Sequence, residues 1–341
     1  MKIICTIGEN INSFDSVDKF VKSGTDMFRF KFSHINYEES DKLIKYIKST
    51  YPNIPIIEDL QGNKVRISTT LENEYKLLQG EKYILCSEKK FDKHNLQISE
   101  NIIPITFQGP VDIFSINDNL KLNNGSTILK IRSVDKNNEE ILVDVVDGGL
   151  IKSGQSINVP RLNRDNSVLT IKDLDDIIWG LKRNVDIIIM SYIANVNEIT
   201  KVKKIICSYI EEGVINSFPL IFAKIECISA IKIIDDIINE ADGIVIGRGD
   251  LSKEIPLMEM PIIQEKIISM CRDKEKPIFI SNNILNSMCN KKYPSVNEIC
   301  ELHYHLKEQV TGIVLCDEVS KGKYPLNALR LAKSLVSEYK E

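Results

Sequence analysis

Short apolar runs alternate with amphipathic helical patterns along most of this chain of 341 residues. Each apolar run but the third is followed directly by a helical pattern, for example over 14–22, 196–210 and 262–271. Eight such strand–helix units predict an α/β fold, a (β/α)8 barrel of the TIM type. The expected strands lie near 2–6, 26–31, 54–59, 185–190, 218–224, 243–246, 277–281 and 311–315.

The segment after the third strand has a different pattern. Turn clusters at Asn123-Asn124-Gly125 and Asp147-Gly148-Gly149 separate short alternating runs such as 141–146. This pattern is typical of antiparallel hairpins, so we expect a small all-β domain inserted before the third helix, where it could act as a lid. The helical pattern resumes over 170–183. The predicted organisation is therefore barrel 1–66, inserted β domain 67–163 and barrel 164–341.

Composition argues against several classes of partner. The net charge is −4 with both signs interspersed, so we expect no nucleic-acid partner. No apolar run approaches the length of a membrane span, and the first strand begins at once without a signal peptide, so we expect no membrane partner. Eight cysteines are scattered without a Cys-x-x-Cys pair. We expect them to be free thiols in a reducing, cytoplasmic setting.

Charged residues gather where two neighbouring strands should end. Lys224 and Glu226 are two positions apart, so on a strand they point to the same side. Asp250 follows the next strand within Gly247-Arg248-Gly249-Asp250. Two carboxylates and one cation suit a magnesium (or manganese) ion shared with a phosphorylated substrate. A structural salt bridge at the barrel rim is the alternative interpretation.

Six segments resemble pyruvate kinases and occur in that family's order. The resemblance implies magnesium-dependent phosphoryl transfer between phosphoenolpyruvate and ADP, giving pyruvate and ATP in glycolysis, and it is compatible with a homo-oligomer. No counterpart of the family's C-terminal regulatory domain precedes Glu341, so we expect that domain to be absent. The segments are 2–8, 29–34, 59–62 with Arg66, 223–226 with 247–252, 277–288 and 321–326.

The resemblance also implies roles for individual residues. Lys224 would meet the phosphoryl group during transfer, Arg29 would hold the substrate phosphate, and Glu226 and Asp250 would hold the metal. Asn282 joins Lys224 and Arg29 as a catalytic residue. The implied substrate-binding residues are Arg29, Gly249, Asp250, Asn282 and Ser191. The implied nucleotide-binding residues are Arg66, His34, Lys321 and Asp118.

The expected proton path departs from the family pattern. Asn282 stands where the family has a threonine, and Cys316 stands where it has a serine. Asparagine can still donate to a carboxylate but carries no hydroxyl to relay a proton. We therefore expect carboxylate binding to survive while protonation of the enolate suffers, and Asn282→Thr to raise pyruvate formation.

The potassium site of the family is also altered. Ser33 and Asp59 are kept, whereas Lys31 replaces an asparagine and Lys64 replaces a glutamate. A fixed ammonium in place of the ion predicts that potassium is not required. The alternative is that both lysines point to solvent.

The nucleotide half departs furthest from the family. Leu60-Gln61-Gly62-Asn63 replaces Thr-Lys-Gly-Pro, Gln155 replaces a lid lysine, and Glu9 replaces a proline. Fewer cationic and apolar contacts should weaken ADP binding. Two alternatives therefore stay open: a transferase or lyase that uses phosphoenolpyruvate or pyruvate with another acceptor, and a catalytically impaired paralogue that binds phosphoenolpyruvate.

Overall fold

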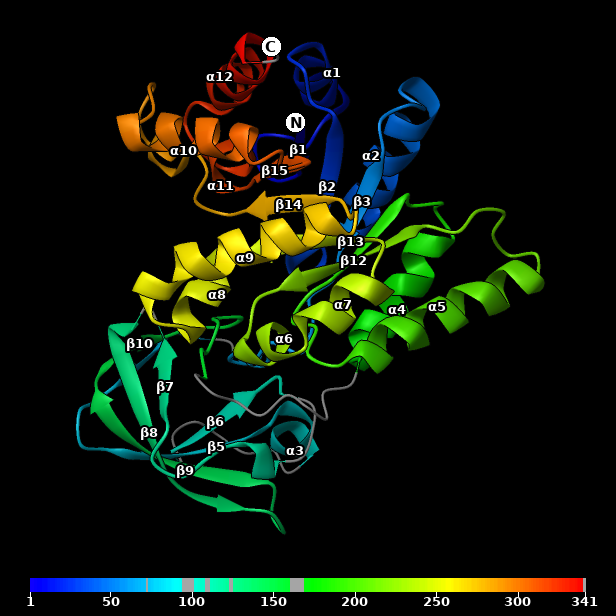
Figure 1. The fold of residues 1–341 in the computed structure, drawn as a ribbon. Helices are drawn as coiled ribbons and strands as arrows, with labels where there is room; N and C mark the ends of the chain where they lie inside the picture. Colours follow the sequence, from blue (N-terminus) through cyan, green and yellow to red (C-terminus); the bar gives the residue numbers. More distant parts are fainter. Residues whose placement is uncertain (72, 94–100, 108–110, 123–124, 160–168, 340–341) are drawn as a thin grey trace. The chain divides into compact units, whose positions relative to one another are not determined.

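The computed structural model describes residues 1–71, 73–93, 101–107, 111–122, 125–159 and 169–339. Eight parallel strands close into a barrel in the order β1-β15-β14-β13-β12-β11-β3-β2 (Figure 1). The predicted fold class is confirmed, and the strands start and end within two residues of the expected positions. They are β1 (Lys2–Thr6), β2 (Met27–Lys31), β3 (Ile56–Asp59), β11 (Ile187–Met190), β12 (Leu220–Ile225), β13 (Gly243–Gly247), β14 (Ile278–Ser281) and β15 (Gly312–Leu315).

Helices follow the barrel strands in sequence. The longer ones are α1 (Phe14–Lys22), α2 (Tyr37–Thr50), α4 (Ile171–Leu181), α5 (Val196–Glu211), α9 (Met260–Asp273), α10 (Val296–Lys307) and α12 (Pro325–Glu338). Shorter ones are η1 (Phe32–His34), α6 (Ile228–Lys232), α7 (Ile234–Glu240), α8 (Arg248–Glu254), η5 (Leu257–Glu259), η6 (Asn286–Cys289) and α11 (Asp317–Ser320). Among the described helices, none is both long and apolar enough to cross a membrane.

Local sequence accounts for where several helices begin. Ser13 and Ser295 each accept a hydrogen bond from the backbone three residues ahead and complete a capping box at α1 and α10. Asn36 caps α2 in the same way, through the backbone N–H of Glu39. These caps fix the points at which the chain leaves the loops at the C-terminal ends of the strands.

The barrel interior is filled by a layer of apolar side chains that point inward from all eight strands. Gly243 leaves room for one of these rings, since a Cβ there would lie 2.6 Å from Cε1 of Phe222. Such a packed layer closes the interior, so chemistry is confined to the ends of the strands. The layer consists of Ile4, Ile57, Ile187, Ile189, Phe222, Val245, Phe279, Val314 and Cys316, with Met27 packed against it.

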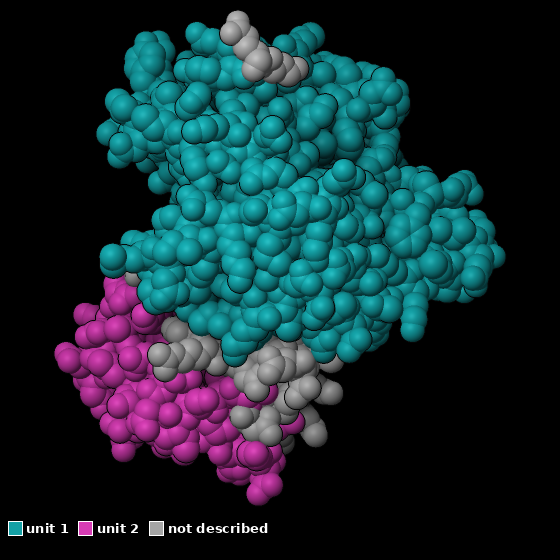
Figure 2. Space-filling view, in the orientation of Figure 1, with its two compact units in different colours: residues 1–62, 171–341 teal, residues 63–170 magenta. Residues whose placement is uncertain are grey.

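Residues 63–170 form a compact unit separate from the barrel residues 1–62 and 171–341 (Figure 2). Its sheets have the strand orders β6-β5-β9-β8-β7 and β10-β4. The strands are β4 (Tyr75–Leu77), β5 (Lys82–Ser87), β6 (Ile102–Ile105), β7 (Asn119–Leu122), β8 (Thr127–Asp135), β9 (Glu140–Asp147) and β10 (Gly149–Ile151). The predicted boundary at 163/164 lies outside the described residues.

Two details of this unit differ from the predicted antiparallel, all-β pattern. The pair β5–β6 is parallel, whereas the other pairs in these two sheets are antiparallel. The segment between those two strands contains the helix α3 (Glu88–Lys93), and η3 (Val111–Ile113) adds a single 3-10 turn. Parallel neighbours need a crossover connection, and residues 88–93 are mostly Glu and Lys, which favour helix over strand.

Candidate active site

Charged and polar side chains form a layer at the C-terminal ends of the barrel strands. The alternation of side chains along each strand places them on the same inward side as the apolar layer, two residues further along. Arg29, Asp59, Lys224 and Ser281 are all almost fully buried. Burial of so many charges is tolerated only where each is paired, so their contacts define the site.

Asp59 is the centre of this layer. Its Oδ2 lies 2.5 Å from Nη2 and 2.6 Å from Nε of Arg29, a two-pronged contact. Lys224 Nζ lies 3.2 Å from the same oxygen, and Ser191 Oγ donates to Oδ1 at 2.9 Å. Burial alone would raise the pKa of Asp59, but the charges of Arg29 and Lys224 outweigh it and lower the pKa to about 2.

Arg29 and Lys224 remain charged because of this anion. Burial acts to lower the pKa of both cations, but Asp59 raises each above its ordinary value, with help from Glu226. Arg29 is also fixed by Nη1, which donates to Thr6 Oγ1 at 2.9 Å and lies 3.6 Å from Cys316 Sγ. The site therefore presents two permanent cations, one near the end of β2 and one near the end of β12.

Glu226 links Lys224 to the loop that follows the preceding strand, β11. Its Oε1 lies 3.2 Å from Lys224 Nζ, and its Oε2 accepts a hydrogen bond of 3.2 Å from the backbone N–H of Tyr192. A Cβ at position 247 would lie 2.5 Å from Cγ of Glu226, so Gly247 is needed for this carboxylate to lie where it does. The ion pair with Lys224 is also what a purely structural salt bridge would show.

Asp250 lies in the first turn of α8, directly after β13, and its Oδ1 is 3.2 Å from Lys253 Nζ. The charge of Lys224 interacts with both Asp250 and Glu226. Within the described residues no group of three or more His, Cys, Asp or Glu side chains could hold a metal by itself. Two carboxylates from neighbouring strand ends nevertheless fit magnesium, which fills its remaining positions with water and substrate oxygens.

Asn282 lies directly after β14, next to Gly249. A Cβ on Gly249 would be 3.3 Å from Cγ of Asn282, and Ser281 Oγ lies 3.1 Å from Asn282 Oδ1. The backbone of Asn282 is left-handed, with φ 72°, and that of Asn283 is too, with φ 56°. Cys316, the second departure on the expected proton path, lies 3.7 Å from Ser281 Oγ.

Lys31 is the last residue of β2 and points to the same side as Arg29. The residue as a whole is exposed, but its ammonium is partly desolvated. This partial burial and the charges of Arg29 and Lys224 lower the pKa of Lys31 to about 8, although Asp59 opposes the shift. Ser33 Oγ is buried and has no hydrogen-bond partner within the described part of the chain.

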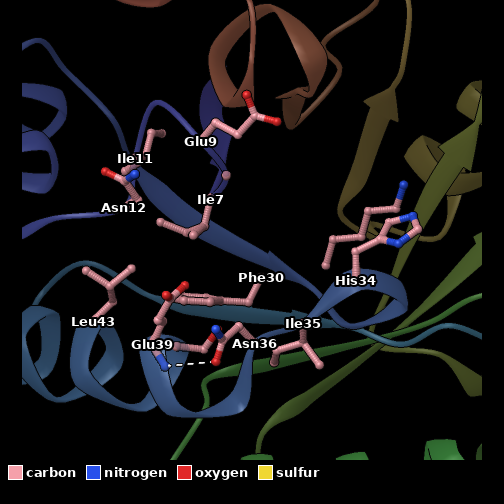
Figure 3. A pocket seen from close by; sticks show the side chains of 13 residues that line it. Ile7, Glu9, Ile11, Asn12, Phe30, His34, Ile35, Asn36, Glu39 and Leu43 are labelled. Atoms are coloured by element: carbon pink, nitrogen blue, oxygen red, sulfur yellow. Dashed lines mark hydrogen bonds between the residues drawn. The ribbon is translucent and has the colours of Figure 1, made fainter.

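A cavity of about 270 Å³ lies beside Lys31, between the loops that follow β1 and β2 (Figure 3). His34 lies at one side of it, and Glu9 and Glu39 supply two carboxylates. The rest of the lining is mostly apolar, with Ile7, Ile11, Phe30, Ile35 and Leu43 among its residues.

The other expected nucleotide-binding residues are divided between the two units. Lys321 is in the barrel, where its Nζ lies 3.1 Å from Asp317 Oδ2. Arg66 and Asp118 are in the unit of residues 63–170, as is Lys64. There, Arg66 Nη1 donates to the Gly154 carbonyl at 3.1 Å.

Comparison with known proteins decides the family. The model of the pyruvate kinase barrel domain matches residues 1–329. The chain belongs to the pyruvate kinase family. This confirms the resemblance inferred from the sequence, and it supports a pyruvate kinase-like function for the barrel.

Curated pyruvate kinases match this chain over nearly all of its length. The pyruvate kinase of Thermococcus litoralis is 29% identical, over 100% of this chain and 70% of that protein. Those of Geobacillus stearothermophilus and Bacillus licheniformis are 27% and 26% identical, over 96% and 100% of this chain and 55% and 57% of those proteins. The chain thus spans little more than half to 70% of the length of these pyruvate kinases.

Sequence reasoning missed several residues that shape this pyruvate kinase-like site. Thr6 holds Arg29, the backbone of Tyr192 holds Glu226, and Arg248 donates to the backbone carbonyls of Asn282 and Asn283. Arg248 was detectable as a charged residue inside the Gly-Arg-Gly-Asp motif. Its partners were not, because they lie more than thirty positions away in the loop after the next strand.

Proposed function

We propose that this chain transfers the phosphoryl group of phosphoenolpyruvate to ADP, giving pyruvate and ATP. The observation that carries the proposal is the continuous series of buried charges Arg29–Asp59–Lys224–Glu226, with successive contacts of 2.5, 3.2 and 3.2 Å. These residues come from the C-terminal ends of three strands, where barrel enzymes carry their active sites.

The two cations suit the charge changes of phosphoryl transfer. The terminal oxygen of ADP attacks phosphorus, the bond from phosphorus to the enol oxygen breaks, and the electron pair leaves with the enolate. Lys224 stays protonated because Asp59 and Glu226 stabilise its ammonium, so it can offset negative charge on the phosphoryl oxygens. Arg29, fixed by Asp59 and Thr6, would hold the substrate phosphate.

Glu226 and Asp250 would hold a magnesium or manganese ion. When bound there, the ion would supply positive charge to the phosphate and enolate oxygens. The backbone N–H groups of Gly249 and Asp250 and the amide of Asn282 would bind the substrate carboxylate. The enolate then takes up one proton at its methylene carbon to become pyruvate.

The test is pyruvate formation from phosphoenolpyruvate and ADP with magnesium, followed by coupling to NADH oxidation with lactate dehydrogenase. We expect ADP-dependent turnover that falls by several orders of magnitude in Lys224→Met. A matched control is Lys203→Met, because Lys203 is a partly buried lysine that pairs with Glu240 on the helical layer. Turnover that does not need ADP, or that Lys224→Met leaves unchanged, would refute the proposal.

A different acceptor is the second candidate. Glu9 and Glu39 line the cavity beside Lys31 and His34, and carboxylates there oppose the phosphates of a nucleotide. Phosphorus NMR separates the alternatives. Phosphoenolpyruvate consumed without formation of ATP favours a transferase or lyase, whereas phosphoenolpyruvate that binds in calorimetry without being consumed favours an impaired paralogue.

A further inference from the structure

Arg248 joins the start of α8 to the loop after β14. Its Nη2 donates to the carbonyl of Asn282 at 2.6 Å and to that of Asn283 at 2.9 Å, and its Nε donates to the Asn282 carbonyl at 3.0 Å. Nη1 pairs with Glu301 of α10. The Arg248 side chain is 11% exposed, so these contacts are largely shielded from water.

The loop that Arg248 holds is strained. Asn282 and Asn283 both have left-handed backbones, with φ 72° and 56°. Asparagine tolerates this conformation better than most residues, but a pair in succession persists only where the surroundings hold it. The two carbonyls of this turn are the groups that the guanidinium binds.

The strained turn directs the amide of Asn282. Ser281 Oγ donates to Asn282 Oδ1 at 3.1 Å, so among the described residues this contact occupies the amide oxygen and leaves the amide nitrogen available as a donor. That nitrogen is 3.4 Å from where a Cβ on Gly249 would lie. Arg248 is the first residue of α8 and directly precedes Gly249. Its side chain binds the carbonyls of the Asn282–Asn283 turn, so it connects the turn that carries the amide to the helix start that the amide approaches.

We propose that Arg248 is a positioning residue that fixes the Asn282 amide against the start of α8, and so preforms the pocket for the substrate carboxylate. The proposal rests on the proposed function, which assigns the carboxylate to Gly249, Asp250 and Asn282. A guanidinium is required because only a planar fork can bind two successive carbonyls and a carboxylate at once.

Glu301 orients the guanidinium from the other side. Its Oε1 also lies 3.5 Å from Nε2 of His305, which is fully buried. Glu301 is 31% exposed, so it can be changed with less damage to packing than Arg248. Glu301→Gln keeps an acceptor for Arg248 and is expected to have a smaller effect than any change at Arg248.

The test compares Arg248→Gln, Arg248→Lys and the double variant Arg248→Gln with Asn283→Gly. Glycine adopts a left-handed backbone without strain, so Asn283→Gly should restore the turn without the guanidinium and leave the Asn282 amide in place. Arg272→Gln is the control, because Arg272 pairs with Glu308 at the opposite end of the barrel strands.

Two measurements are made on the full chain. The first is hydrogen exchange in peptides covering 280–289, with peptides covering 262–273 as the internal reference. The second is calorimetric binding of phosphoenolpyruvate with manganese and without ADP. We expect Arg248→Gln and Arg248→Lys to speed exchange only in 280–289 and to weaken binding at least ~10-fold, the loss of one charged hydrogen bond. The double variant should recover most of the slow exchange and most of the affinity for phosphoenolpyruvate. Arg272→Gln should change neither the exchange over 280–289 nor the affinity.

The outcomes separate the two proposals. Wild-type protein that binds no phosphoenolpyruvate refutes the proposed function, while the exchange data still test the role of Arg248. Unchanged exchange over 280–289 in Arg248→Gln overturns the positioning role. So does faster exchange over all peptides without rescue by Asn283→Gly, since that pattern means that Arg248 only stabilises the fold.

Discussion

The guanidinium of Arg29 binds Asp59 through two nitrogens, at 2.5 and 2.6 Å, and neither side chain is more than 4% exposed. Neither residue could be buried there alone, because an unpaired charge in the interior costs several kcal/mol. Lys224 shares the same carboxylate, so one anion holds both cations of the candidate active site.

Asp59→Asn should lower the free energy of unfolding at neutral pH more than at acidic pH. The pKa of Asp59 in the folded state is lowered to about 2. The ionised carboxylate therefore stabilises the fold fully at pH values above the pKa of an unfolded aspartate, and this stabilisation is lost as pH falls toward the folded-state pKa. The full contribution is about 2 kcal/mol, roughly half of it lost by pH 3. Urea unfolding should show a smaller difference in free energy of unfolding between wild type and variant at pH 3 than at pH 6.

The control for this experiment is Asp15→Asn, which removes a highly exposed partner of Lys19. Exposed pairs contribute little, so its effect should be small at both pH values. A gap between wild type and Asp59→Asn that does not depend on pH would show that Asp59 is not held ionised by its neighbours.

Glu226→Gln and Asp250→Asn should each weaken divalent-metal binding at least ~10-fold, because each removes one of only two carboxylates. Manganese titration followed by electron paramagnetic resonance measures this directly. Glu259→Gln, an exposed carboxylate in η5, is the matched control. Unchanged manganese affinity in either Glu226→Gln or Asp250→Asn would refute the assignment of that residue as a metal ligand.

Any phosphotransfer activity should not need potassium. The resemblance to the family implies that the Lys31 ammonium takes the place of the ion, and the charge of Asp59 acts on this ammonium. Rates in potassium chloride and tetramethylammonium chloride at equal ionic strength should agree. Lys31→Asn should make the rate rise with potassium, since the buried Ser33 hydroxyl and Asp59 remain as ligands. A steep potassium response in the wild type contradicts the prediction.

Asn282→Thr should not raise pyruvate formation, contrary to the expectation from the sequence. Threonine is β-branched and disfavours the left-handed backbone seen at φ 72°, at a cost of about 1–2 kcal/mol. Lower stability in urea unfolding and no gain in pyruvate formation are expected, with Asn282→Gly as the unstrained control. A faster variant would mean that the loop rearranges to accept threonine.

Glu58→Leu should stabilise the protein above neutral pH. Glu58 lies against Gly180 of α4, and neither of its carboxylate oxygens has a hydrogen-bond partner within the described residues. Burial, then Asp176, raises its pKa well above the ordinary value. The folded state therefore holds the proton more tightly, and stability falls as pH rises from about 4.5.

Unfolding at pH 5 and pH 8 checks this prediction. The increase in the free energy of unfolding caused by Glu58→Leu should be larger at pH 8 than at pH 5. Between the unfolded-state and folded-state pKa values of Glu58 it should grow by up to ~1.4 kcal/mol per pH unit. Glu38→Leu, on the exposed first turn of α2, is the control. An equal effect at both pH values would show that Glu58 does not change protonation on folding.

Much of this fold follows from local sequence. The strands of the barrel were predicted to within two residues, and α1 was predicted to begin and end at the observed residues. Lys224 and Glu226 were expected to share one side of their strand, and they do, 3.2 Å apart. Such features depend on neighbours two to four positions away, so periodicity and capping residues are sufficient to predict them.

Contacts between residues that are distant in the sequence were decided only by the tertiary structure. The sequence did not show that Asp59 would bind Arg29 and Lys224 together, or that Arg248 would hold the Asn282–Asn283 turn. Nor did it show that Glu58 would be buried with no hydrogen-bond partner among the described residues. Each depends on which strands become neighbours when the barrel closes, and on which side chains the helices then cover. Closure brings residues 29, 59 and 224 together, and no local pattern records their distances.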